Sequence, residues 1–204
     1  MEVDFSCIAT PDYANVLGHQ QFIDYRIHPL WPDMPRMSGP AFTVQLSAGD
    51  HLMMHAAIYQ APSGSIIVVD GVDDKFAVAG GNVCAVAQSR GIKGFIIDGV
   101  IRDITEIQQM QFPVFAKGVF PVPGKKRVYS ELEQTIQCGG VKVCSGDIIV
   151  ADTEGVAVLP KEQAIEVYHA AKDKADKEAA MSLAQWQANH QSRIEAALAA
   201  AKSS

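Results

Sequence analysis

The sequence lacks the features of a membrane protein and of a disulfide-stabilised secreted domain. No stretch approaches the roughly 18 to 20 continuous apolar residues that are needed to cross a bilayer. The start, Met1-Glu2-Val3-Asp4, has no basic leader before an apolar run. The 4 cysteines include no Cys-x-x-Cys pair, which argues against structural zinc and a disulfide framework. We therefore expect a cytoplasmic protein with no membrane partner and with reduced, mostly buried thiols.

Basic charge is also scarce. The chain has 17 Lys and Arg against 23 Asp and Glu, a formal net charge of -6 at pH 7, and its one basic cluster is Lys125-Lys126-Arg127. A nucleic-acid surface neutralises phosphates with many basic side chains. The composition therefore excludes nucleic acid as a partner, and we interpret the short cluster as a solvated loop.

The composition that is present is that of a globular protein. The chain has 204 residues, of which 48% are hydrophobic and 20% charged, enough for one domain with a substantial core. We expect an α/β domain over residues 1–160 and a helical extension over residues 161–204 that packs on the domain or on a neighbouring subunit. The alanine-rich extension predicts one helix reaching towards Ala201. Forty helical residues extend roughly 60 Å, so this helix is either a solvated amphipathic helix or an arm that contacts another subunit.

The hydrophobic pattern predicts alternating strands and helices. Residues 65–71 and 94–99 are short apolar runs that end in turn signals, and between them Gly80-Gly81 opens a helix that closes at Gly91, which makes one β-α-β unit. Thr10 precedes Pro11 as a capping residue of a helix to about Gly18. Four prolines predict an irregular loop over residues 28–40. Further helices are expected at 52–58 and 103–110, and further strands at 41–46, 114–119, 134–137, 141–144, 147–151 and 156–159.

Two features with chemical potential meet near residues 80–103. A glycine pair at a helix start exposes amides at the positive end of the helix dipole, where a carboxylate or phosphate binds. Twenty residues separate Gly81 from Arg102, enough for one helix and the returning strand, so both should lie at one edge of the sheet. Arg102 offers a planar fork for a carboxylate, and Asp103 an oxygen ligand for Mg²⁺ or Mn²⁺. Such a pair suits a small 2-oxo acid, although spacing alone also allows a tight turn and a surface ion pair.

A longer series of residues resembles a known signature. The pattern Gly81-x20-Arg102-Asp103-x2-Glu106 is framed by Gly91-x-x-Gly94 and Asp98-Gly99, and it continues through residues 112–118 and 146–160. It resembles the RraA-like family and its class II pyruvate aldolases, which include the 4-hydroxy-4-methyl-2-oxoglutarate and 4-carboxy-4-hydroxy-2-oxoadipate aldolases. The resemblance covers roughly residues 10–165. It implies a swivelling β/β/α sandwich with a long C-terminal helix, assembled as a homotrimer or as a hexamer of two trimers.

The resemblance also implies roles for individual residues. The amides of Gly80, Gly81, Asn82 and Val83 would bind the substrate carboxylate, Arg102 would contact the carboxylate and the carbonyl, and Asp103 would hold the metal. Glu106 would support metal-bound waters. The implied reactions are cleavage of a 4-hydroxy-2-oxo acid to pyruvate and decarboxylation of oxaloacetate. The alternative is a non-catalytic RraA-type regulator that binds a ribonuclease, but such regulators typically lack the acid after the arginine, so Asp103 favours an enzyme.

Some residues depart from the pattern or have simpler interpretations. Many of these aldolases carry Asp or Glu where this chain has Gly81, so either Asn82 or a neighbouring subunit compensates, or aldol cleavage is weakened relative to decarboxylation. A methyltransferase function has been attached to relatives. We discount it for this chain, because the sequence has no glycine-rich dinucleotide-type loop with a following acidic residue that would hold a methyl donor. Cys84 has no His-Asp pair and is interpreted as packing. Among the histidines, we expect a core or interface position for His55, and structural or solvent roles for His19, His28, His51 and His169.

Overall fold

The computed structural model describes residues 3–202, whose centre is a seven-stranded sheet with the order β1-β5-β4-β3-β2-β8-β9. Strands β2 to β5 run parallel to one another, and β1, β8 and β9 pair antiparallel with their neighbours. Parallel strands buried on both faces are almost continuously apolar, as β3 and β4 are here. The strands are β1 (His28–Pro29), β2 (Met37–Gln45), β3 (Ile66–Asp70), β4 (Gly94–Ile101), β5 (Val114–Val119), β8 (Ile148–Asp152) and β9 (Gly155–Leu159).

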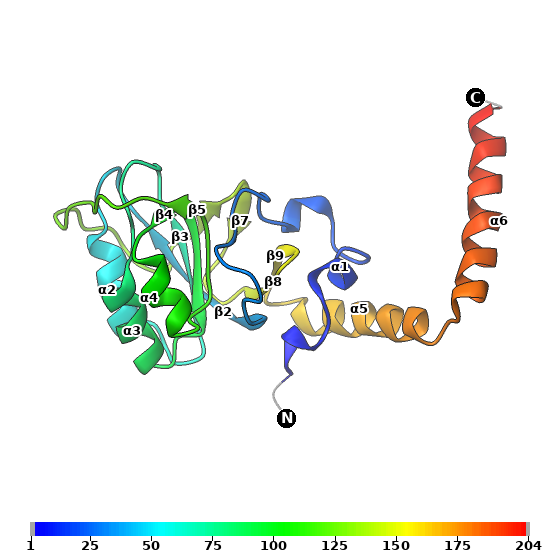
Figure 1. The fold of residues 1–204 in the computed structure, drawn as a ribbon, viewed down its shortest axis with the longest axis horizontal. Coiled ribbons are helices and arrows are strands. Elements are labelled where there is room, and N and C mark those ends of the chain that lie inside the picture. Colours follow the sequence, from blue (N-terminus) through cyan, green and yellow to red (C-terminus); the bar gives the residue numbers. More distant parts are fainter. Residues whose placement is uncertain (1–2, 203–204) are drawn as a thin grey trace.

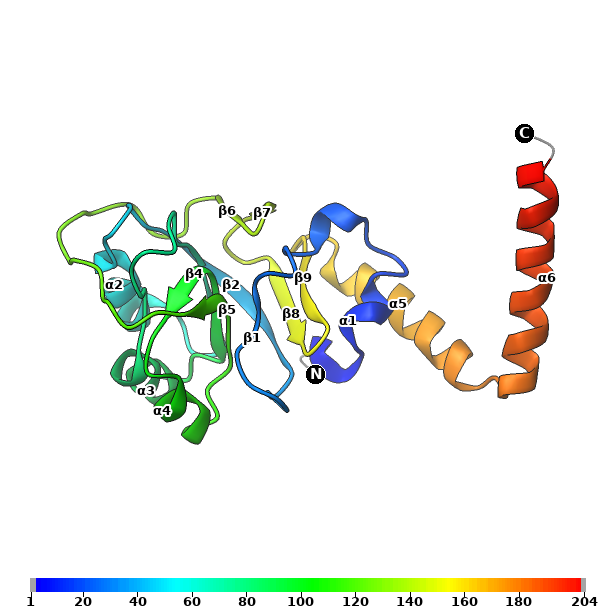
Figure 2. The same ribbon diagram turned by 45° about the horizontal axis from the view of Figure 1, so that its top comes forward.

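Helices cover one face of this sheet (Figure 1). They are α2 (Leu52–Gln60), α3 (Gly81–Ser89) and α4 (Ile104–Gln109). The hairpin of β6 (Ile136–Cys138) and β7 (Val141–Val143) packs against β3 on the side away from these helices (Figures 1 and 2). The expected β-α-β unit is confirmed as β3-α3-β4, and the expected α/β fold is confirmed with it.

The predicted irregular loop over residues 28–40 is wrong at both ends. β1 occupies its start, and β2 begins at Met37 and runs through Pro40. β2 pairs antiparallel with β8 as far as Pro40 and parallel with β3 from Ala41 onwards. Proline cannot donate to a strand ladder, and Pro40 lies where β2 changes its partner, so the strand tolerates it.

The predicted first helix is also too long. α1 spans only Thr10–Tyr13, between the short 3-10 helices η1 (Phe5–Cys7) and η2 (His19–Gln21). Thr10 is not its cap, because the Thr10 hydroxyl donates to Asp152 Oδ1 at 2.6 Å. The residue before α1 is instead Ala9, whose amide donates to Asp12 Oδ2. The tertiary contact with Asp152 therefore replaces the local cap that the sequence indicated.

The C-terminal extension is helical as expected, but the prediction that it forms one long helix is wrong. It consists of α5 (Ala164–Ala179) and α6 (Leu183–Lys202). A new capping box starts α6, because the Ser182 amide donates to Gln185 Oε1 and the Gln185 amide donates to Ser182 Oγ. α5 packs on α1 through a small second core, whereas α6 buries no residue and stands away from the body (Figures 1 and 2). No helix within residues 3–202 is long and apolar enough to span a membrane.

Candidate active site

The site lies where β4 ends and α3 begins. The Arg102 amide donates to Ala79 O at 3.0 Å, and the Val78 amide donates to Val100 O at 2.9 Å. Residues 78–80 therefore run beside the end of β4 and deliver the start of α3 to Arg102 and Asp103. The Gly81 amide donates to Asp103 Oδ2 at 3.1 Å. The structure thus brings the glycine pair and the Arg-Asp pair together at one edge of the sheet.

Gly80 and Gly81 leave room for two carboxylates. Gly80 has an extended backbone with φ of -152°, and Gly81 is the first residue of α3, so neither adopts a left-handed conformation. A Cβ at Gly80 would collide with Asp103 Oδ2, and a Cβ at Gly81 would collide with Glu106 Oε2. The Glu106 carboxylate therefore lies where a side chain at position 81 would begin. This places an acid beside Gly81, although position 81 itself lacks the acid that the family resemblance led us to expect there.

Asp103 is held in an unusual backbone conformation. Its φ of 61° and ψ of 37° are left-handed, which Asp tolerates better than most side chains. Oδ2 accepts from the Gly81 amide and lies 3.5 Å from Arg102 Nε, while Oδ1 has no hydrogen-bond partner within the described chain. The side chains of Arg102 and Asp103 are 43% and 35% exposed, so their ion pair is weak and both remain accessible to a ligand.

Three of the four amides expected to bind a carboxylate are available. The Gly81 amide is taken by Asp103, whereas the amides of Gly80, Asn82 and Val83 have no acceptor within residues 3–202. They lie at the N-terminus of α3, which has 9 residues. The first amides of a helix lack an intrahelical partner and lie at the positive end of its dipole. This end of α3 can therefore accept an anion.

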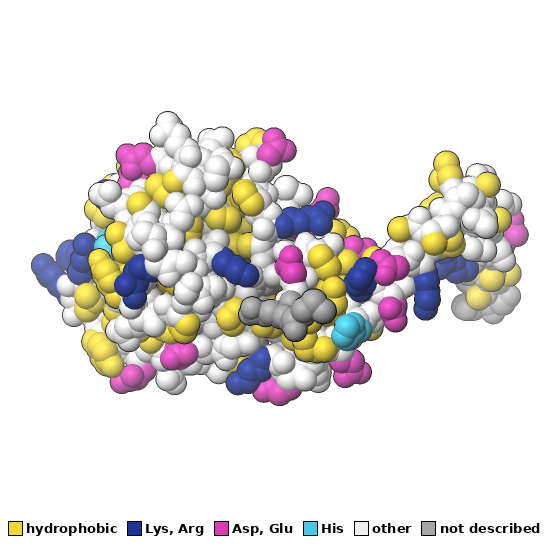
Figure 3. Space-filling view, turned by 90° about the horizontal axis from the view of Figure 1, so that it is seen from below, with side chains coloured by type: hydrophobic (Ala, Val, Ile, Leu, Met, Phe, Trp, Pro, Cys, Tyr) yellow, Lys and Arg dark blue, Asp and Glu magenta, His cyan; other side chains and the backbone are white. Residues whose placement is uncertain are grey.

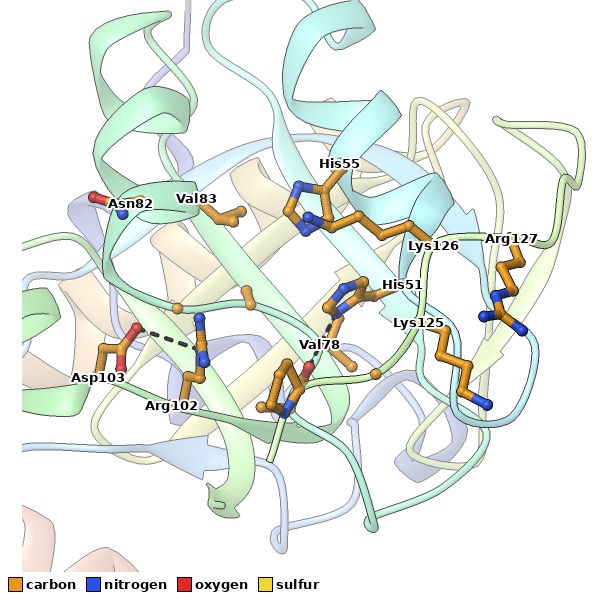
Figure 4. A pocket seen from close by; sticks show the side chains of 15 residues that line it. His51, His55, Val78, Asn82, Val83, Arg102, Asp103, Lys125, Lys126 and Arg127 are labelled. Atoms are coloured by element: carbon orange, nitrogen blue, oxygen red, sulfur yellow. Dashed lines mark hydrogen bonds and ion pairs between the residues drawn. The ribbon is translucent and has the colours of Figure 1, made fainter. Parts of the chain in front are cut away.

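These residues open on one cavity of about 450 Å³ (Figure 4). Its wall also contains side chains for which the sequence predicted no role in a site. They come from the start of α2 and from the loop that follows β5, and Figure 4 shows Lys126 of this loop extending towards His55. The site residues in the wall are Gly80, Asn82, Val83, Arg102 and Asp103, and the unexpected ones are His51, His55, Lys125, Lys126 and Arg127.

Backbone contacts fold the basic loop back onto the cavity. The His51 amide donates to Lys125 O at 2.8 Å, and the Arg127 amide donates to Asp50 Oδ2 at 2.7 Å. Lys125, Lys126 and Arg127 are exposed, as expected for a solvated loop, but they also form one wall of the site. The sequence gives no local signal for this arrangement, because the paired segments are far apart in the chain.

The basic loop gives the cavity a strongly positive wall. Arg102, Lys125, Lys126 and Arg127 line it together with one carboxylate, that of Asp103. Figure 3 shows dark-blue Lys and Arg side chains gathered at the end of the molecule away from α6. A cleft lined by one sign of charge concentrates ligands of the opposite sign. The balance therefore favours an anionic ligand.

Two neutral imidazoles lie among these cations. The rings of His51 and His55 are 4.8 Å apart, and His51 Nδ1 lies 3.1 Å from Ala77 O. Burial lowers the pKa of His51. Burial, followed by the charges of Lys126 and His51, lowers the pKa of His55 to about 4. Both rings are therefore neutral at pH 7, and both belong to the cavity wall, which the sequence did not predict.

None of the cysteines lies in the wall of this cavity as the described residues form it. All 4 are free, as expected. Cys84 is fully buried, and this burial raises its pKa well above the ordinary thiol value, which confirms its interpretation as packing. The expectation of mostly buried thiols is only half right, because Cys7 is exposed and Cys144 is half-buried, while Cys84 and Cys138 are buried.

A larger groove of about 990 Å³ lies at the other ends of the parallel strands. Lys93, just before β4, is part of its wall and donates to Ser38 O at 2.6 Å. Ligands of α/β sheets gather at the carboxyl ends of the strands. The smaller cavity is at those ends and contains the Arg-Asp pair, so we assign the chemistry to it.

Comparisons with known proteins match most of the chain. The family model described as "RraA-like: Aldolase/RraA" matches residues 10–158. A Halalkalibacterium halodurans protein named putative 4-hydroxy-4-methyl-2-oxoglutarate aldolase is 39% identical over 177 residues, which cover 86% of this chain and 84% of that protein.

Solved structures share the fold. A Geobacillus kaustophilus protein named S-adenosylmethionine: 2-dimethylmenaquinone methyltransferase is 31% identical, with a TM-score of 0.69 over 76% of this chain and 96% of that one. The RNA-processing inhibitor RraA from Thermus thermophilis is 22% identical, with a TM-score of 0.68 over 79% of this chain and 94% of that one. At this identity the second likeness concerns the fold alone.

Proposed function

Since the chain belongs to the RraA-like family, we propose that it is a divalent-metal-dependent carbon–carbon lyase. It would cleave a 4-hydroxy-2-oxo acid to pyruvate by a retro-aldol reaction, decarboxylate oxaloacetate, or catalyse both reactions. One observation supports this proposal above the others. Arg102, Asp103 and the free amides at the start of α3 open on the same positive cavity.

The chain's own residues supply the substrate contacts. The carboxylate of the 2-oxo acid would lie between the Arg102 guanidinium and the amides of Asn82 and Val83. The guanidinium would also donate to the 2-oxo oxygen, which gains negative charge as the pyruvate enolate forms. Donors aimed at developing charge are among the largest contributions to catalysis. The basic loop on the other wall would bind the second carboxylate of the substrate.

Asp103 and Glu106 fit a divalent metal. Asp103 Oδ1 has no protein partner, and the Glu106 carboxylate lies beside Gly81. Within residues 3–202 no set of three or more metal-ligating side chains comes together. Mg²⁺ and Mn²⁺ suit such a site, because they bind through one or two carboxylates and keep several waters. We assign Asp103 as the ligand and Glu106 as the support of the waters. The metal would supply Lewis-acid polarisation of the 2-oxo group.

Two substitutions test the proposal. Arg102→Ala removes the carboxylate and enolate contact, and Asp103→Ala removes the metal ligand. Each should lower kcat/KM for Mg²⁺-dependent pyruvate release from oxaloacetate and from 4-hydroxy-4-methyl-2-oxoglutarate by about 100-fold or more. Circular dichroism should show an intact fold. Arg26→Ala is the matched control, because Arg26 forms an exposed ion pair with Asp24 at 2.8 Å outside the cavity.

The metal requirement has its own test. EDTA should abolish turnover, and borohydride should not trap the substrate, because no lysine Schiff base is involved. Near-normal activity of either site variant would contradict the residue assignment. Borohydride trapping with EDTA-resistant turnover would contradict the metal-dependent mechanism. A wild-type protein that binds a ribonuclease and releases no pyruvate would be a regulator of the RraA type.

A further inference from the structure

The proposed binding of the 2-oxo acid leaves the imidazoles of the cavity without a role. His51 is the better defined of the two, since it is only 7% exposed and its Nδ1 lies 3.1 Å from Ala77 O. A carbonyl oxygen can only accept a hydrogen bond, so a neutral ring carries its proton on Nδ1. Its Nε2 then holds a lone pair, and no hydrogen bond within the described chain occupies it.

The surrounding backbone fixes this ring beside the cations. The His51 amide donates a hydrogen bond to Lys125 O. The neighbouring Asp50 carboxylate accepts hydrogen bonds from the amides of Leu52 at 2.9 Å and Arg127 at 2.7 Å. The His55 ring lies 4.8 Å away on the other side. This hydrogen-bonded segment therefore presents a proton acceptor next to the loop that would bind the substrate's second carboxylate.

A 4-hydroxy-2-oxo acid has a group that needs such an acceptor. Its 4-hydroxyl proton must leave as the bond between C3 and C4 breaks. The imidazoles among the side chains of this cavity are His51 and His55, and the Asp103 carboxylate is already held by the Gly81 amide. Burial is the main reason why the pKa of His51 is lowered. The charges of Lys126 and Arg102 lower it further, whereas the hydrogen bond to Ala77 and the charge of Asp50 act in the opposite direction.

We propose that His51 is the catalytic base that accepts the proton of the substrate's 4-hydroxyl group, a role that rests on the proposed lyase function. Nε2 takes the proton, the O–H electron pair becomes the second bond of a carbonyl at C4, and the C3–C4 pair becomes the pyruvate enolate. The enolate takes a proton from water at C3, and the imidazolium returns its proton to water. The products are pyruvate and a second carbonyl compound.

A pair of reactions isolates this step. Retro-aldol cleavage of 4-hydroxy-4-methyl-2-oxoglutarate requires removal of the hydroxyl proton, whereas decarboxylation of oxaloacetate reaches the same enolate without it. In His51→Asn the side-chain amide can still donate to Ala77 O, but no atom replaces Nε2. Its kcat for cleavage should fall about 10² to 10³-fold, the range of general base catalysis, while kcat for decarboxylation stays within about threefold.

The control is His28→Asn. His28 Nδ1 also contacts a backbone carbonyl, that of Arg26 at 2.9 Å, but His28 is exposed and lies outside the cavity, so both reactions should persist. Equal loss of both reactions in His51→Asn would show a structural role, and unchanged cleavage would show that another group is the base. Either result overturns this role and leaves the lyase function standing. A wild-type protein without either reaction would overturn the lyase function as well.

Discussion

At the scale of single residues, the absence of a side chain at position 81 gives the site its form. A Cβ there would displace the Glu106 carboxylate, so an acid at 81 and Glu106 in its present place exclude each other. The sequence left open whether Asn82 or a neighbouring subunit compensates for the missing acid, or whether aldol cleavage is weakened relative to decarboxylation. The structure adds Glu106 as an acid from the same chain. This could not be predicted from spacing, because it depends on how closely α4 approaches the start of α3.

The same scale explains which site residues the sequence could identify. Arg102 and Asp103 directly follow a buried strand, and the rule that ligands gather at strand ends predicts their place. His51 and Lys125 have no such local pattern, because only a backbone hydrogen bond of 2.8 Å between distant segments brings them together. A histidine that follows an aspartate before a helix is an ordinary capping arrangement in the sequence.

We expect His55 to make the protein less stable in acid. Its pKa in the folded protein is about 4, below the ordinary 6.5. Burial of the ring is the main cause, and the charges of Lys126 and His51 lower the pKa further. The His55 imidazole therefore binds a proton near pH 6.5 in the unfolded chain, but only near pH 4 in the folded chain. Stability is full above pH 6.5 and is lost as the pH falls towards 4. The loss should be about 1 to 2 kcal/mol, discounted because the ring is partly exposed.

Urea denaturation at pH 7 and pH 4.5 measures this effect. The difference in the free energy of unfolding between the two pH values should shrink in His55→Asn and persist in His169→Asn, since His169 is exposed. If His55→Asn kept the full pH dependence, the acid sensitivity would belong to other groups.

At the scale of elements, Asp98 joins three of them. It lies at the irregular position of β4, where its Oδ1 is 2.7 Å from Lys117 Nζ of β5 and its Oδ2 accepts from the Gly139 amide of the β6–β7 hairpin at 2.7 Å. Asp98→Ala should lower the free energy of unfolding by about 2 to 3 kcal/mol, because both partners lose a charged acceptor.

The matched control for this network is Asp74→Ala. Asp74 also pairs with Lys117, at 3.2 Å, but its side chain is 54% exposed, so the loss should stay below about 1 kcal/mol. Urea denaturation of the two variants compares them directly. Equal losses would mean that the contact with Lys117, and not the link to the hairpin, is what matters.

The elements themselves were predictable where their signals are local. β3, α3 and β4 follow from apolar runs and glycine turns, and the Ser182-Leu183-Ala184-Gln185 capping pattern was available to divide the C-terminal helix. The course of β2 was not, because Pro40 belongs to a strand only through its two partners, β8 and β3. Tertiary pairing overrides local preference at such positions.

At the scale of the whole molecule, the site and α6 lie at opposite ends (Figures 1 and 3). α6 has 20 residues and none of them is buried. Its larger apolar side chains face solvent in the described chain, and they are Leu183, Trp186, Ile194 and Leu198. Most of the stability of a helix in a protein comes from the tertiary packing of an apolar face. α6 therefore adds little to the stability of the fold, whereas α5 buries Ala164 and Ala171 in the second core.

A chain that ends at Ala179 should therefore keep its activity and melt within about 2 °C of the full chain, since no core residue is lost. A chain that ends at Glu162 removes α5 as well and should melt much earlier. We propose the homotrimer or hexamer that the family resemblance implies, and sedimentation velocity should find the same assembly with and without residues 180–204. A lower mass or a large drop in melting temperature for the shorter deletion would show instead that α6 is an arm that holds neighbouring subunits. Its apolar side chains would then be buried in the assembly, and Trp186 fluorescence in the full chain would shift to the red on dilution to monomer.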